Sequence, residues 1–377
     1  MRSVHVLVLT ACSAASSAPN PDGSTIDREA ARPAAARTVP SRPLKLGDGA
    51  STARVIEAHV LASIDDAPAS DRPAYARADQ HVTLHAAIVS ESAGKRVVYS
   101  DAKAVVLGGK RLSPKPLANA PELELRWNRI EPAVATMSNG DTPSEFHFEP
   151  IDYRATPIDT ATNAASISAD VRPTLTPDYG HGVGTMRYQI VVLQGDRLIA
   201  SPGPESRRGK GAGGVTDDVL RISIRRDDSY LGYLTEMYGQ PYIWASAGLS
   251  DTSHESEHLE GSDCADFVVY GMRRLGKRLG YTWTGALPQL SSLLASGERA
   301  ADGVYRDHAD KPLPFTRIGD LVLFPRHVGV LALDRGTLGV LDDQDLMMHT
   351  LFDSPKEQAI AESGYADTPV ELRRFER

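Results

Sequence analysis

The feature that most constrains the fold is a series of short strand-like runs between residues 51 and 205. Apolar and polar residues alternate in 123–127, around Phe146, and in 186–193. Two further runs, 81–89 and 96–99, flank a Ser-Ala-Gly turn. A period of two places alternate side chains on one face of a strand. Clusters of Pro, Gly and Asn separate the runs, so 51–205 is predicted to form a mainly β domain, a sandwich or a small barrel.

The pattern changes after a Gly-rich stretch, and 206–226 is predicted to be a linker. That stretch does not end in Gly-Lys-Ser/Thr and does not follow directly on a strand, which argues against a nucleotide-binding loop. The remaining residues, 227–377, mix helical and strand periodicities. The predicted elements are helices at 229–238, 264–279 and 287–294, and tightly connected strands at 320–324 and 327–333.

The net charge is −8 at pH 7, so the chain offers no excess of basic residues to neutralise a phosphate backbone. We therefore expect no nucleic-acid partner. No apolar run approaches the ~20 residues that a transmembrane helix needs.

The first twelve residues predict export. An arginine, a short apolar stretch and small residues precede Cys12, in the order of a secretory signal. The run LTAC at 9–12 resembles the bacterial lipobox, which implies that Cys12 is acylated and anchors the protein to a membrane in the cell envelope or periplasm. The alternative is an ordinary cleaved signal in which Cys12 has no role. Residues 13–50 are rich in Ala, Ser, Pro and Arg and are predicted to be a disordered tether.

Cys264 is the candidate nucleophile. It stands in the first turn of a predicted helix, directly after a Ser-Asp pair suited to capping it. The positive end of a helix dipole is expected to lower the pKa of a thiol there, and the nearby N–H groups can stabilise an oxyanion. A thiol nucleophile needs a proton carrier, for which His327 is the candidate, and a third group that orients the imidazole. His349 is the candidate for that third role, and the alternatives are Asp342, Asp343 and Asp345.

Four runs of the sequence together resemble the NlpC/P60 cell-wall peptidases. They are YGQPYIW at 238–244, GSDCADFV at 261–268, IGDLVLF at 318–324 and HVGV at 327–330. The resemblance covers about a third of the chain and leaves the β-rich region outside it. It implies an α+β fold for 227–377, a papain-like domain in which an N-terminal helix carrying the cysteine packs on an antiparallel sheet.

The resemblance also implies a function for 227–377. Cys264 would be the nucleophile, His327 the general base and acid, and His349 the orienting residue. Tyr242 would assist the oxyanion and Asp263 would help to hold the substrate. The implied reaction is hydrolysis of an amide bond in peptidoglycan stem peptides, through a thioester and without a cofactor or metal. The β-rich domain could place such an enzyme on the wall or on an envelope protein.

The sequence departs from the family around the substrate groove. Ala245-Ser246 replace two glycines, Ala265-Asp266 replace Ser-Gly, and 249–260 is a polar insertion. Two other functions therefore stay open: a thiol amidase that acts on a different amide, and a non-catalytic module that binds wall peptides or proteins. Structural alternatives are an inert buried thiol at Cys264 and a metal site formed by His254, His258 and Cys264, for which the spacing is unsuited to zinc.

Overall fold

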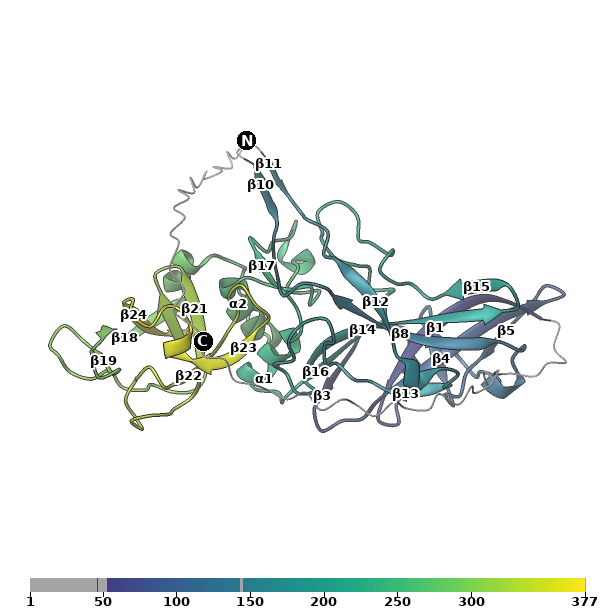
Figure 1. Ribbon diagram of the computed structural model, residues 1–377, viewed down its shortest axis with the longest axis horizontal. Coiled ribbons are helices and arrows are strands. Elements are labelled where there is room, and N and C mark those ends of the chain that lie inside the picture. Colours follow the sequence, from purple (N-terminus) through teal and green to yellow (C-terminus); the bar gives the residue numbers. More distant parts are fainter. Residues whose placement is uncertain (1–45, 47–52, 143–144, 377) are drawn as a thin grey trace, which may run out of the picture.

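A computed structural model describes residues 46, 53–142 and 145–376 (Figure 1). The chain is mostly β, with 42% of residues in strands and 12% in helices, and the sheets are curled. The predicted α+β, papain-like fold with an N-terminal helix is therefore wrong. Within the described residues the longest α-helix, α2, spans only Cys264–Arg274.

Two large sheets form most of the described structure before residue 226. The first has the strand order β13-β4-β1-β2-β6-β7, with β5 on β4, and the second has the order β12-β8-β14-β16-β3, with β15 on β14. The strands of the first sheet are β1 (Arg54–Ile64), β2 (Ala69–Ser70), β4 (Val82–Ser92), β5 (Lys95–Tyr99), β6 (Val105–Leu107), β7 (Lys110–Leu112) and β13 (Ser166–Ser168). Those of the second are β3 (Ala74–Arg77), β8 (Glu124–Pro132), β12 (Tyr153–Pro157), β14 (Gly184–Gln194), β15 (Arg197–Ala200) and β16 (Arg221–Arg225).

The strands form where the sequence alternates. In β8, Leu125 and Trp127 are buried and Arg126 between them is exposed. The hairpin predicted at 81–99 is confirmed as β4–β5. Its two turn residues, Ala93 and Gly94, both have positive φ (49° and 75°), as a tight two-residue hairpin turn requires. The strand β16 lies within 206–226, the range predicted as a linker.

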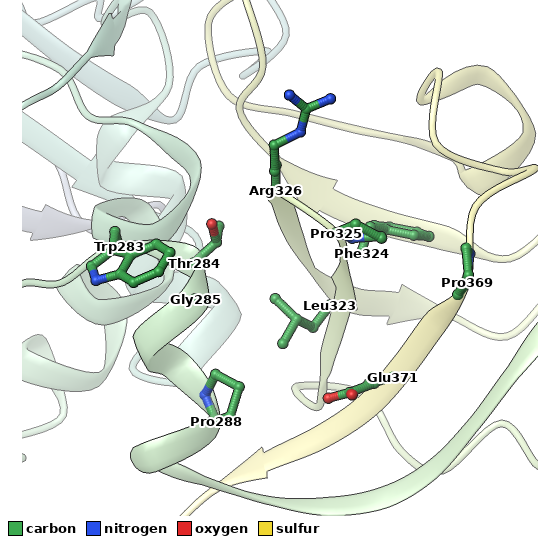
Figure 2. A pocket seen from close by; sticks show the side chains of 10 residues that line it. All are labelled: Trp283, Thr284, Gly285, Pro288, Leu323, Phe324, Pro325, Arg326, Pro369 and Glu371. Atoms are coloured by element: carbon green, nitrogen blue, oxygen red, sulfur yellow. The ribbon is translucent and has the colours of Figure 1, made fainter. Parts of the chain in front are cut away.

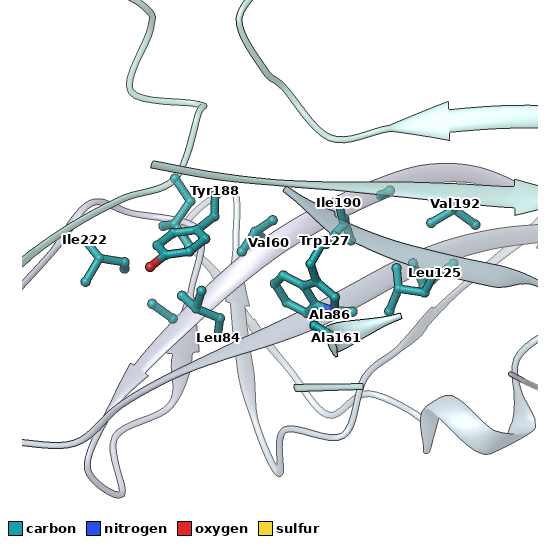
Figure 3. Packing of buried hydrophobic residues seen from close by; sticks show 14 of the residues in the cluster. Val60, Leu84, Ala86, Leu125, Trp127, Ala161, Tyr188, Ile190, Val192 and Ile222 are labelled. Atoms are coloured by element: carbon teal, nitrogen blue, oxygen red, sulfur yellow. The ribbon is translucent and has the colours of Figure 1, made fainter. Parts of the chain in front are cut away.

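The two sheets face each other across one apolar core (Figure 3). Val60 and Leu84 come from the first sheet, and Trp127, Tyr188 and Ile190 come from the second. The Trp127 side chain is 1% exposed, and its Nε1 donates a hydrogen bond of 2.9 Å to the carbonyl of Ala164. Burial of these faces in a common core makes this region a two-layer β structure.

A third sheet has the strand order β19-β18-β24-β20-β21-β22-β23. Its central strands alternate between two cores: Leu321, Leu323 and Val330 pack against α1 and α2, whereas Val322 and Leu331 face the opposite side. The elements are α1 (Tyr230–Leu234), η3 (Thr235–Met237), η5 (Thr284–Gln289), β18 (Ser291–Arg299), β19 (Tyr305–Arg306), β20 (Leu321–Phe324), β21 (His327–Leu333), β22 (Leu346–His349), β23 (Lys356–Ala359), η6 (Ile360–Glu362) and β24 (Val370–Phe375).

Two helix predictions differ from the structure. Residues 287–294 do not form an α-helix, because η5 ends at Gln289 and β18 then pairs with β24. Backbone pairing with a distant strand outweighs local helical periodicity there. The helix α2 ends at Arg274 and not near 279, since Gly276 adopts φ 86°, a left-handed conformation that stops a helix. The predicted strands at 320–324 and 327–333 are confirmed as β20 and β21.

The buried carboxylate of Glu236 joins the sandwich to α2. Tyr270 Oη and Arg274 Nε, both on α2, donate to Glu236 Oε2 at 2.5 and 2.8 Å. Arg225, the last residue of β16, reaches the other carboxylate oxygen at 3.5 Å. A second connection is the parallel pairing of β9 (Thr136–Ser138) with β17 (Tyr242–Trp244). The short hairpin of β10 (Gly140–Thr142) and β11 (Glu145–His147) projects beside it (Figure 1).

The predicted signal, Cys12 and most of the predicted tether lie outside the described residues. Leu46 forms an isolated bridge with Leu123. No helix in 53–142 or 145–376 is long and apolar enough to cross a membrane.

Replacing Trp127 with alanine should destabilise the protein by about 3–5 kcal/mol, because the substitution leaves a cavity and an unpaired carbonyl in the core. Urea denaturation followed by circular dichroism measures this as a lower midpoint. Leu198→Ala is the control, since Leu198 is 67% exposed on β15 and should change stability by no more than about 0.5 kcal/mol. Equal midpoints for the two variants would contradict the packing described above.

Candidate active site

The candidate nucleophile stands at the first position of α2. Asp263 is the N-cap, and its Oδ1 accepts hydrogen bonds of 2.9 Å from the N–H groups of Ala265 and Asp266. The Cys264 N–H is not used by this cap and lies toward its own sulfur. The capped helix start therefore fixes the position of the thiol and leaves a backbone donor beside it.

A buried polar network holds the helix start from the side. Ser246 Oγ donates to Asp266 Oδ2 at 2.7 Å and accepts from the Asp263 N–H at 2.9 Å. His254, from the polar insertion, approaches the same Asp266 oxygen at 3.2 Å and stacks on Tyr281 with ring centroids 3.8 Å apart. Ser246 and Asp266 thus stabilise each other beside the start of α2.

His327 and His349 are brought together by the pairing of β21 with β22. His327 Nε2 lies 2.8 Å from His349 Nδ1, and both side chains are buried. Gly329 makes room for this contact, since a Cβ there would lie 3.3 Å from the Cβ of His349 and 2.7 Å from Met347 Sδ. The other nitrogen of His327, Nδ1, is buried and has no hydrogen-bond partner among the described residues.

Cys264 packs against the same end of β21. The N–H of Val328, the residue after His327, favours the thiolate form of Cys264 and so tends to lower its pKa. The side chain of Cys264 belongs to the core cluster that includes Val328, and the residue is 6% exposed. Cys264, at the start of α2, therefore packs beside the start of β21, where His327 and Val328 are consecutive residues.

The pKa shifts of Cys264 and His327 both favour neutral side chains. Burial raises the pKa of the Cys264 thiol, the Asp263 carboxyl raises it further, and the Val328 N–H opposes both. The expectation of a lowered thiol pKa is therefore wrong for this state, because burial and a nearby carboxylate outweigh the helix terminus. Burial and the neighbouring His349 lower the pKa of His327. A protonated thiol beside a neutral imidazole is thus the resting pair.

The carboxyl of Asp263 is also shifted. Burial and the nearby Asp266 raise the pKa of Asp263 well above its usual range, although the helix N–H groups oppose the shift. For His349, burial lowers the pKa to about 4, and Gln358 on β23 opposes this shift. The shift of His349 therefore favours its neutral form.

Aromatic side chains cover the site. Tyr242, on β17, packs edge-on against Phe352 with ring centroids 5.3 Å apart, and Cys264 contributes to a raised pKa of its phenol that is due mainly to burial. The Tyr242 hydroxyl makes no hydrogen bond within the described part of the chain. Tyr365 stacks on His327 at 4.8 Å. The sequence did not single out Phe352 or Tyr365, because neither lies in a recognisable motif.

Two hollows flank Trp283 next to the site. One, of about 390 Å³, is bordered by Ser246, His254, Asp263 and Asp266. The other, of about 320 Å³, runs between η5 and the strands β20 and β24 (Figure 2). Trp283 and Pro288 form one wall, and Leu323 and Phe324 form the other. This second hollow is a mostly apolar groove with Arg326 at one end and Glu371 toward the other.

The three aspartates considered in place of His349 are engaged elsewhere. Asp343 pairs with Arg299 at 2.6 Å, and Asp342 and Asp345 accept backbone N–H groups of their own loop. His349 is therefore the polar group in contact with His327. Among the residues that the structure describes, no three His, Cys, Asp or Glu side chains are placed to hold a metal ion, so His254, His258 and Cys264 do not form such a group.

Comparison of the chain with protein-family models, with curated proteins and with solved structures found no match.

The buried pair His327–His349 predicts a dependence of stability on pH. The pKa of His349 is about 4 in the folded protein and about 6.5 in the unfolded chain. Between these values the unfolded chain binds more protons, so stability is full above pH 6.5 and falls as the pH drops toward 4. The expected slope from this group is at most about 1.4 kcal/mol per pH unit.

Urea unfolding of the parent and of His349→Asn at pH 4 to 7 measures this slope. The variant should show a flatter fall between pH 6.5 and 4. Only the difference between the two curves reports on His349. Burial raises the pKa values of Glu255 and Asp345 to about 7, and these two groups contribute a slope of the opposite sign in both proteins. Parallel curves for parent and variant would contradict the lowered pKa of His349.

Proposed function

We propose that this protein is a cysteine hydrolase that cleaves amide bonds, with Cys264 as the nucleophile. The observation that carries the proposal is the arrangement of His327. Its Nε2 contacts His349 at 2.8 Å, while its Nδ1 is buried and has no hydrogen-bond partner in 53–142 or 145–376. The next residue in β21, Val328, packs against Cys264. A buried nitrogen without a hydrogen-bond partner costs stability and calls for an explanation, and accepting a proton from the thiol would be one.

Acylation would begin with proton transfer. In the tautomer whose Nε2–H donates to His349, the Nδ1 of His327 accepts the thiol proton as the Cys264 sulfur attacks the carbonyl carbon. The charge that develops on the carbonyl oxygen is stabilised by the Cys264 N–H and by the hydroxyl of Tyr242. His327 then gives its proton to the leaving amine, the C–N bond breaks, and a thioester remains.

Deacylation would reuse the same groups. His327 takes a proton from a water molecule, the hydroxide attacks the thioester, and the proton returns to the sulfur as the carboxylic acid departs. His349 holds the imidazole in one orientation through both steps, and the stacked ring of Tyr365 limits its rotation. Asp263 acts by capping the helix that carries the thiol, and it lines the polar hollow where substrate would lie.

The substrate class rests on the sequence resemblance to the NlpC/P60 peptidases and on the predicted export signal. Both favour peptidoglycan stem peptides as substrates and the cell envelope as the location, with Cys12 as a lipid attachment site. In this proposal the sandwich, joined to α2 through Glu236, would position the enzyme on the wall or on an envelope partner.

The two alternatives make different demands on the site. A thiol amidase with another substrate would use the same three residues, and the altered residues Ser246 and Asp266 at the polar hollow favour that possibility. A non-catalytic binding module would not need the buried contact between His327 and His349.

Incubation of the full chain with purified peptidoglycan and with synthetic stem peptides, followed by mass spectrometry, tests the proposal. Cys264→Ala should lower kcat/KM by at least about 10³-fold, because it removes the nucleophile. His327→Gln should be similarly impaired, and His349→Ala less so, since it only loosens the orientation of the imidazole.

Cys264→Ser is a matched control that keeps size and polarity at the helix start. A parent protein that cleaves no peptide, although folded and reactive toward iodoacetamide at Cys264, would exclude hydrolysis of stem peptides. A parent whose activity survives Cys264→Ala would exclude the proposed nucleophile.

A further inference from the structure

Arg326 occupies an unfavourable backbone position directly before His327. Phe324 pairs with His327 across the β20–β21 hairpin, so Pro325 and Arg326 alone form the turn. Pro325 holds its own φ negative, which excludes the usual hairpin turns that need a positive φ at the first turn residue. The positive φ falls on Arg326 instead, at 121°.

Glycine is the residue that adopts such a φ without strain. In the β4–β5 hairpin the second turn residue, which also has a positive φ, is a glycine, Gly94. An arginine here costs stability, and strained residues that persist in folded proteins cluster at functional sites. The turn itself does not require the guanidinium, so the side chain has to be useful for another reason.

The guanidinium of Arg326 is available to a ligand. It is exposed and forms no ion pair or hydrogen bond with any side chain in 53–142 or 145–376. It stands at one end of the groove formed by Trp283, Pro288 and Leu323 (Figure 2). It also acts on Tyr365, the ring that stacks on His327, where it opposes the raised pKa that burial and Cys264 produce.

We propose that Arg326 is a specificity-determining residue that binds a carboxylate in the leaving-group part of the substrate, whose apolar portion lies in the groove beside Trp283. This inference rests on the proposed function. His327 delivers a proton to the leaving amine, so the residue next to it in the hairpin lies on the leaving-group side. A guanidinium pairs with a carboxylate through two parallel N–H···O bonds, which gives both affinity and orientation.

The test compares two synthetic stem peptides that differ only in the residue after the cleaved bond, which carries either a free carboxylate or a carboxamide. Binding is measured by calorimetry in the Cys264→Ala background, where no turnover occurs. Cys264→Ala with Arg326 intact should bind the carboxylate peptide about 10- to 100-fold more tightly than the carboxamide peptide. Adding Arg326→Gly should abolish this preference. Adding Arg326→Lys in its place should keep part of it, because an ammonium keeps the charge but cannot form two parallel hydrogen bonds with a carboxylate.

Two further measurements separate this role from a structural one. Arg326→Gly should raise the thermal midpoint and Arg326→Ala should not, because only glycine relieves the positive φ. Arg278→Gly, at an exposed arginine after α2, is the control for loss of one positive charge and should leave the preference unchanged.

Equal binding of the two peptides by Cys264→Ala with Arg326 intact, or a preference that survives Arg326→Gly, would overturn the inference. Such results would leave the hydrolase proposal standing if the intact chain still cleaves the peptides. Conversely, a carboxylate preference that depends on Arg326 in a chain that never cleaves would support the inference and count against the hydrolase.

Discussion

The position of α2 depends on one buried carboxylate. Glu236 is fully buried and accepts hydrogen bonds from Tyr270 and Arg274 on α2 and from Arg225 at the end of β16. A buried charge with these donors is tolerated, whereas the same charge without them would be very costly. The helix that carries Cys264 is therefore held to the sandwich by contacts that cannot be removed singly without leaving a charge unpaired. The β9–β17 pairing adds a second, backbone connection at Tyr242.

Around this anchor the site is built from neutral, buried groups. Burial raises the pKa of the Cys264 thiol and lowers those of His327 and His349, so charge appears only when a proton moves between them. A dry site strengthens the electrostatic effect of each donor on developing charge. The rings of Tyr242 and Tyr365 pack at this site, and the two hollows flank Trp283 beside it.

Several elements could be predicted from local sequence. Alternation located β4, β8 and β14, and the hairpin of β20 and β21 was evident from two apolar runs with a tight connection. The start of α2 followed from Ser262 and Asp263 before an apolar stripe. Other elements could not be predicted in this way. The helix expected at 287–294 became β18 because β24, some eighty residues later, supplies its hydrogen bonds. The predicted α+β fold was wrong for the same reason, since pairing between strands from distant segments dominates the described structure.

The sequence by itself determined where the helix with the cysteine begins and which residues are candidates for catalysis, because capping and apolar periodicity act over a few neighbouring residues. Only the tertiary structure decided that His349, and none of the nearby aspartates, contacts His327, since this depends on the register of β21 and β22. It also decided the protonation of the thiol and the placement of Arg326 at the end of a groove. Burial and pairing between distant segments set these properties, and neither is encoded in any local run of residues.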